Sequence, residues 1–149
     1  TGATTPFSIS MAPVAYSLTD NSVGMGGFSY KELLHSSQGS YISQWNVQAY
    51  GCYDAETFQA IVDNGFDASR LVFGMLGDEY EDATDFTTAM TELETITATY
   101  PTFRGAIIWE YGDTKIEGVV WGQAVRRAIC AGKQRHAMKN QGDYSCVVM

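Results

Sequence analysis

The chain has 149 residues, of which 45% are hydrophobic and 13% aromatic, and its formal net charge is -8. This length suits one domain with a buried core, and the apolar content argues against disorder. The acidic balance disfavours nucleic acid and anionic membranes as partners, because phosphate binding relies on Lys and Arg surfaces.

The first half of the sequence alternates between apolar runs and short helical segments. Phe7 to Val14 (F-S-I-S-M-A-P-V) predicts a strand, and a helix from Ser29 to Ser36, capped by Ser29, follows a glycine-containing loop. Tyr41 to Tyr50 predicts a second strand. Asp54 then stands where it caps the helix A-E-T-F-Q-A-I-V-D-N, which Gly65 ends.

The second half repeats this order. Arg70 to Leu76 predicts a third strand, and an acidic loop leads to a helix from about Asp85 to Thr99, whose apolar residues recur at three- and four-residue steps. Gly105 to Tyr111 predicts a fourth strand and Gly118 to Ala131 a last helix. The remaining residues are polar, so we expect one α/β domain over residues 1–131 and a C-terminal tail over residues 132–149.

This regular alternation predicts right-handed βαβ units and a parallel sheet. Strands covered on both sides should be apolar throughout, yet Asn46, Gln48 and Tyr50 share one face of the second strand, because side chains alternate along it. A polar face suits the interior of a barrel near its mouth. We therefore expect an α/β fold of four βα units that resembles half of a (β/α)8 barrel, with a small α/β/α sandwich as the alternative.

Several segments carry a resemblance to a known family. Q-W-N-V-Q-A-Y, A-I-V-D-N-G-F-D-A-S-R-L-V-F-G-M-L and Y-P-T-F-R-G-A-I-I-W-E-Y resemble the sixth, seventh and eighth strand regions of glycoside hydrolase family 18, the chitinases and their fungal relatives. S-M-A-P resembles the fifth strand of the family. The resemblance spans about Phe7 to Ile129 and implies the C-terminal half of a barrel that binds N-acetylglucosamine polymers at the ends of its strands.

The resemblance also implies ligand-binding residues. Tyr50 matches the tyrosine that contacts the acetamido group of the substrate, Gln48 matches the amide two residues earlier, and Trp109 matches the tryptophan under the central sugar. Met11, on the matching fifth strand, would border that subsite, and Asn46 shares the polar face of Gln48. The alternative is that Trp109 and Tyr50 are ordinary core aromatics.

The catalytic motif of the family, D-x-x-D-x-D-x-E, does not occur in the sequence. In that family a glutamic acid protonates the glycosidic oxygen while an aspartate steadies the acetamido group. We therefore expect no catalytic residue, and a lectin-like protein that binds N-acetylglucosamine or N-acetylgalactosamine glycans. The alternatives are a chitinase fragment active only with its missing N-terminal half, and an interaction protein with no sugar site.

No cofactor or metal is expected, because His35 and His136 have no Cys or carboxylate at ligand spacing. A half barrel exposes two sheet edges, so the expected protein partner is a complementary half-barrel chain or a second copy in a homodimer. The resemblance also implies secretion, because proteins of this family are usually secreted.

Three cysteines, Cys52, Cys130 and Cys146, allow one disulfide, and a pair between Cys130 and Cys146 would fasten the tail to the last helix. The ending C-V-V-M also fits a prenylation motif on Cys146. Prenylation would place the protein in the cytosol, on a membrane, and is the alternative to secretion. It is the only membrane attachment expected, since no segment reaches the roughly 18 apolar residues of a membrane helix.

Overall fold

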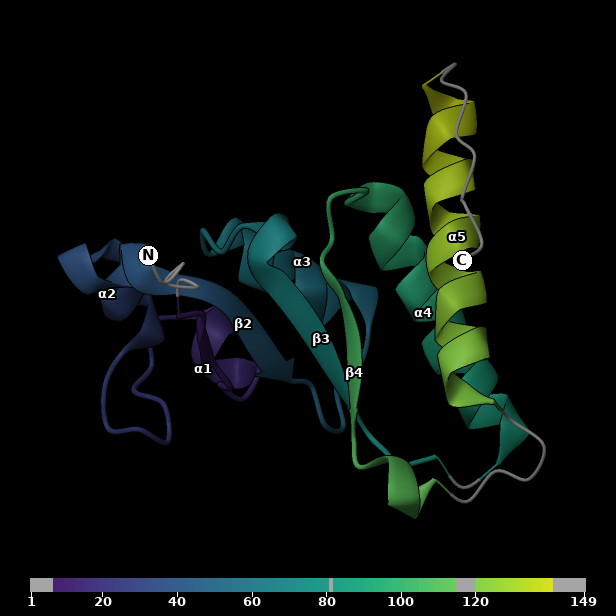
Figure 1. Ribbon diagram of the computed structural model, residues 1–149, viewed down its shortest axis with the longest axis horizontal. Coiled ribbons are helices and arrows are strands. Elements are labelled where there is room, and N and C mark those ends of the chain that lie inside the picture. The colour runs from purple at the N-terminus through teal and green to yellow at the C-terminus, as the bar shows by residue number, and fades with distance from the viewer. Residues whose placement is uncertain (1–6, 81, 115–119, 141–149) are drawn as a thin grey trace, which may run out of the picture.

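The computed structural model describes residues 7–80, 82–114 and 120–140. In it, four parallel strands form one sheet, and their order in space, β1-β2-β3-β4, is their order in the sequence (Figure 1). The strands are β1 (Ile9–Met11), β2 (Ile42–Gln48), β3 (Leu71–Leu76) and β4 (Gly105–Trp109).

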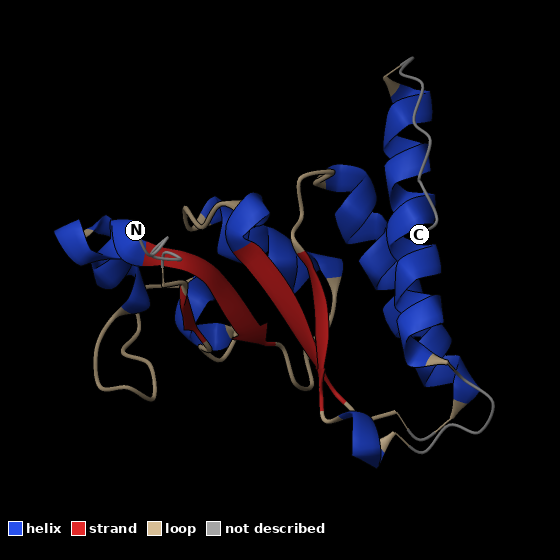
Figure 2. Ribbon diagram, in the orientation of Figure 1, coloured by secondary structure: helices blue, strands red, loops and turns tan. Residues whose placement is uncertain are grey.

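Helices follow each of these strands along the chain (Figure 2). They are α1 (Tyr16–Thr19), α2 (Tyr30–His35), α3 (Ala55–Asp63), α4 (Ala83–Thr99) and α5 (Trp121–Lys139), with short 3-10 segments at Ser37–Tyr41, Ala68–Arg70 and Tyr111–Asp113. Figure 1 shows α4 and α5 side by side at the β4 end of the sheet. No described helix is long and apolar enough to cross a membrane.

The predicted helix caps are confirmed. Ser29 accepts a hydrogen bond from the backbone N–H of Glu32 at the start of α2, and Asp54 accepts one from Thr57 at the start of α3. Gly65 follows the end of α3 with a φ of +102°, a left-handed value that favours glycine. These ends are therefore set by local chemistry that the sequence shows directly.

The prediction of a tail directly after Ala131 is wrong, because α5 continues to Lys139. Contacts with α4 hold this extension in place: Arg135 forms an ion pair with Glu94, and His136 Nδ1 lies 2.8 Å from the carbonyl oxygen of Ala98. Gly132 packs so closely that a Cβ there would lie 2.5 Å from the Glu94 carbonyl oxygen. Residues 141–149 lie outside the described part of the chain.

The helices cover one face of the sheet. Trp45 and Val47 of β2 and Phe73 of β3 are fully buried there, against Phe58 of α3 and Leu93 of α4. On the opposite face the side chains of β2 and β4 remain partly or largely exposed in the described part of the chain. This one-sided arrangement is that of half a barrel and differs from the α/β/α sandwich that the sequence left open.

Candidate functional site

A cavity of about 520 Å³ lies on the open face of the sheet. Its described lining consists of Ala12, Asn46, Gln48, Tyr50, Ile107, Ile108 and Trp109. The structure thus brings together Asn46, Gln48, Tyr50 and Trp109, four of the five residues expected at a ligand site. They come from β2, from the turn after it and from the end of β4.

The strand register explains why these residues meet. Gln48 is aligned with Gly74 of β3, and Gly74 is aligned with Ile107 of β4. Since aligned residues of parallel strands point to the same face, Gln48 and Ile107 lie on either side of a residue that has no side chain. A Cβ at Gly74 would lie 3.2 Å from Ile107 Cγ1 and 2.7 Å from the Val47 carbonyl oxygen, so the glycine keeps this face hollow.

The amides in the cavity are held by the protein yet keep free hydrogen-bonding groups. Gln48 donates from Nε2 to the carbonyl oxygen of Ala12 at 2.6 Å. Asn46 Oδ1 accepts from Gln44 Nε2 at 2.8 Å, and Gln44 in turn accepts from Arg104 Nε at 2.9 Å. Within the described residues, Asn46 Nδ2 and Gln48 Oε1 make no such bond, so a donor group and an acceptor group remain for a ligand.

The two aromatic residues stand at opposite sides of the lining. Trp109 is 63% exposed and ends β4, and the peptide bond between Trp109 and Glu110 is cis. Tyr50 is half-buried in the turn after β2, where burial raises the pKa of its phenol. The phenol therefore stays protonated at neutral pH and can donate a hydrogen bond.

Met11 is not at this cavity. It is aligned with the fully buried Trp45 and packs against the core on the helix-covered face. The register of β1 shifts between Ile9 and Ser10, and after this shift Ala12, not Met11, lines the cavity. Ala12, Ile107 and Ile108 were not predicted from the sequence. Ile107 could have been, because it lies two residues before Trp109 and therefore on the same face of β4.

Comparison with known proteins shows which solved structures this chain is similar to. No protein-family model and no curated protein matches the sequence. Among solved structures, a chitinase, ChiC, from Aspergillus fumigatus is similar with a TM-score of 0.61 and 27% identity, over 83% of this chain and 47% of that one. A fungal endo-beta-N-acetylglucosaminidase from glycosyl hydrolase family 18 is similar with a TM-score of 0.63 and 27% identity, over 85% of this chain and 45% of that one.

The chain is similar to part of the family 18 barrel. This finding confirms the resemblance drawn from the sequence and the half-barrel fold. The chain spans less than half the length of each of these two structures, so the activity of a whole family 18 enzyme does not follow from the similarity.

The cysteines and possible metal ligands were the other features that the sequence singled out. Cys130 is disulfide-bonded and Cys52 is a free thiol, while the expected partner Cys146 and the C-V-V-M ending lie outside the described residues. Among the described residues, no three His, Cys, Asp or Glu side chains are grouped to hold a metal ion.

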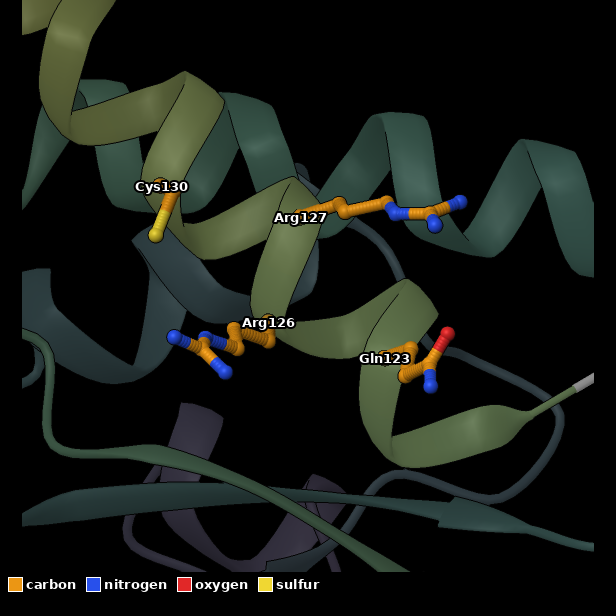
Figure 3. A pocket seen from close by; sticks show the side chains of 4 residues that line it. All are labelled: Gln123, Arg126, Arg127 and Cys130. Atoms are coloured by element: carbon orange, nitrogen blue, oxygen red, sulfur yellow. The ribbon is translucent and has the colours of Figure 1, made fainter. Parts of the chain in front are cut away.

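A second cavity, of about 380 Å³, has a different character. Its described lining residues, Gln123, Arg126, Arg127 and Cys130, all lie on α5 (Figure 3). It includes none of the residues that the family 18 resemblance singled out, and none of these four side chains is aromatic. We therefore place the candidate site on the sheet, at the cavity that Trp109 and Tyr50 line.

Proposed function

We propose that this chain binds glycans containing N-acetylhexosamine in the cavity on the open face of its sheet and does not hydrolyse them. The observation that carries the proposal is the composition of that cavity: an exposed indole, a phenol and two amides in one hollow. Flat aromatic rings stack on the C–H patches of sugars, and a few placed polar groups then fix orientation.

The free groups of the amides match the chemistry of an acetamido substituent. That substituent has one N–H donor and one carbonyl acceptor, and the cavity offers Gln48 Oε1 as acceptor and Asn46 Nδ2 as donor. The Tyr50 phenol adds a second donor. One of the similar proteins is an endo-beta-N-acetylglucosaminidase, which supports N-acetylglucosamine as the first sugar to test. N-acetylgalactosamine, which carries the same acetamido group, is the second.

Binding without hydrolysis is supported by the absence of an acid. The described lining of the cavity includes no carboxyl group, and the motif D-x-x-D-x-D-x-E does not occur in the 149 residues. Cleavage of a glycosidic bond by this chemistry needs a carboxylic acid beside the leaving oxygen. The second candidate function is a chitinase assembled with a complementary half, and the coverage of less than half of each similar structure favours it.

A glycan array with the purified chain, run beside a hydrolysis assay on N-acetylglucosamine oligomers, tests both candidates. Binding to N-acetylhexosamine glycans without turnover is the expected result. Turnover by the pure chain would overturn binding without hydrolysis. The absence of binding and turnover would overturn glycan binding by this chain alone, and turnover that begins only when a complementary half-barrel chain is added would support the assembled chitinase.

The proposed function includes a protein partner that covers the edges of the sheet. Within the described residues β1 and β4 each pair with one neighbour only, so both edges of the sheet are open. Open edges are rarely left uncovered, which supports a complementary half-barrel chain or a second copy as partner. Light scattering during size-exclusion chromatography of the array sample gives the molar mass. That mass distinguishes a monomer, a homodimer and a complex with a second chain.

We further propose secretion, which the disulfide at Cys130 supports, because disulfides persist in oxidising compartments. Mass spectrometry of the natural protein after thiol alkylation tests it. We expect Cys130 and Cys146 to be joined in a disulfide and Cys146 to carry no farnesyl group. A farnesyl group on Cys146 would overturn secretion.

A further inference from the structure

The helix α5 carries most of the positive charge of an acidic protein. Its 19 residues include five of the nine Lys and Arg residues of the chain and no Asp or Glu, although the formal net charge of the chain is -8. The five cations are Arg126, Arg127, Lys133, Arg135 and Lys139. A helix with this charge attracts anions, whereas the rest of the chain repels them.

The cavity of about 380 Å³ on this helix, the α5 cavity, contains two of the five cations. Its described lining residues, Gln123, Arg126, Arg127 and Cys130, stand at positions i, i+3, i+4 and i+7, which share one face of a helix. Figure 3 shows the side chains of Arg126 and Arg127 extending to opposite sides of this face. The volume is in the range of small-molecule sites, and no described residue lines both this cavity and the one on the sheet.

No described carboxylate forms an ion pair with either arginine of the α5 cavity. Arg127 also borders a groove between α4 and α5, in which Glu94 lies. The ion pair found in the described part of the chain nevertheless joins Glu94 to Arg135, one helical turn or more away from the cavity. The charges of Arg126 and Arg127 are therefore left without a counter-charge among the described residues.

Arg126 provides the observation that points to a ligand. Its Nη2 atom is buried and has no hydrogen-bond partner. An arginine that only solvates the surface keeps its nitrogens in water, whereas a buried donor without an acceptor lowers the stability of the fold, and more so in a charged group. What this atom lacks is an acceptor, and a bound anion would supply one.

We propose that the α5 cavity binds the oxyanion group, a carboxylate, sulfate or phosphate, of a small molecule. Arg126 is the anchoring residue, because a guanidinium group can donate two parallel N–H bonds to two oxygens of one such group. Arg127 adds positive charge, and the amide of Gln123 can donate a further hydrogen bond. Cys130 is disulfide-bonded and adds no charge. The inference does not depend on glycan binding at the sheet.

The first experiment titrates the whole chain with sodium sulfate, sodium phosphate and sodium acetate in turn. Sodium chloride keeps the ionic strength constant, so that binding is separated from the screening of surface charge. NMR shifts of the backbone amides of residues 120–140 report occupancy of the cavity. We expect saturable binding of at least one of the three ions, and the ion that binds most tightly identifies the group that the ligand carries.

The second experiment repeats the titration with variants. Arg126→Gln removes the charge and the paired donors, so its dissociation constant should rise at least about tenfold, the loss that one hydrogen bond to a charged group produces. Arg126→Lys keeps the charge without the paired donors and should fall between this variant and the wild type.

Lys139→Gln is the matched control, because it removes one charge from an exposed position at the far end of the same helix. At a rise of about 1.5 Å per residue, Lys139 lies about 20 Å along the helix from Arg126. This separation exceeds the Debye length of about 8 Å at physiological ionic strength. The control should therefore bind the ion within about twofold of the wild type.

Thermal melts separate ligand binding from a role in the fold. Without added ion, Arg126→Gln should melt at or above the wild-type temperature, because it removes a buried charge that has no partner. A saturating concentration of the ion should raise the Tm of the wild type and of Lys139→Gln, and should leave the Tm of Arg126→Gln unchanged.

Three results would overturn the inference. One is the absence of saturable binding of all three ions by the wild type. Another is equal affinity in the wild type and Arg126→Gln, which would mean that Arg126 does not contact the ion. The third is equal weakening in Arg126→Gln and Lys139→Gln, which would show diffuse attraction to the charge of α5 in place of a site.

Discussion

The backbone N–H of Gly77 donates a 2.7 Å hydrogen bond to the carbonyl oxygen of Trp109. This bond extends the pairing of β3 with β4 one step beyond the aligned residues Leu76 and Trp109. It therefore sets the direction in which the chain leaves β4, immediately after the indole that lines the cavity. The residue that controls this direction is a glycine because a Cβ would meet the Glu110 carbonyl oxygen.

Replacement of Gly77 by alanine should displace the chain around Trp109. The added Cβ would lie 2.5 Å from the Glu110 carbonyl oxygen, and backbone must move to relieve the contact. We expect a loss of about 1–3 kcal/mol in the free energy of unfolding, typical of overpacking, and at least about tenfold weaker binding of N-acetylglucosamine oligomers. Urea unfolding and ligand titration measure the two effects.

Gly112→Ala is the matched control for this change, since a Cβ at Gly112 would meet nothing within 4 Å. It should leave stability and binding near the wild-type values. Wild-type behaviour of Gly77→Ala would show that the contact with Glu110 does not position Trp109.

Replacement of Trp109 by alanine should remove glycan binding while the fold persists. The side chain is 63% exposed, so its loss should change the free energy of unfolding by less than about 1 kcal/mol. Loss of the stacking surface should weaken binding at least about tenfold, and Trp109→Phe, which keeps a ring, should fall between alanine and the wild type. Isothermal titration with an N-acetylglucosamine tetramer measures the affinities.

Tyr41→Ala serves as the control for aromatic loss, because Tyr41 is 71% exposed and precedes β2, at the opposite end of that strand from Gln48. It should bind as the wild type does. Full affinity in Trp109→Ala would move the binding site away from this cavity.

The core prediction concerns Phe58 of α3, which is fully buried against the rings of Phe73 and Phe103, at centroid distances of 5.3 and 5.1 Å. Phe58→Ala should lower the free energy of unfolding by about 3–5 kcal/mol, the range for deleting a buried aromatic ring. Chemical denaturation followed by circular dichroism measures it. Phe28→Ala, at a partly exposed ring, is the control, and equal losses in the two variants would contradict the assigned core.

Much of the fold could be predicted from the sequence because its signals are local. Ser29 and Asp54 cap their helices with their own side chains, and alternation along β2 places Asn46 and Gln48 on one face. The end of α5 could not be predicted, because Arg135 and His136 are held by contacts with Glu94 and Ala98 of another helix.

The residues of the candidate site were likewise predicted only in part. Gln48, Tyr50 and Trp109 could be named from the family resemblance, and the structure places them around one cavity. Met11 was misplaced because the side to which it points depends on a register shift in β1 that the sequence does not reveal.

The titration of Glu79 gives the last prediction. Burial raises the pKa of this carboxyl, and the charge of Asp78 raises it further, whereas the hydrogen bond from the Gly51 N–H lowers it; the net shift is upward. The folded protein therefore binds this proton more tightly than the unfolded chain does. Its contribution to stability is fully present below the unfolded pKa, about 4.3, and is lost as the pH rises through the raised folded value.

Because Glu79→Gln carries no titratable group at this position, it should match the stability of the wild type at acidic pH. As the pH rises, the wild type should become the less stable of the two, and the difference should level off above the folded pKa. Urea unfolding of both proteins between pH 4 and pH 8 measures this difference. If the wild type instead gains stability over the variant as the pH rises, the ionised carboxylate is the form that the fold favours.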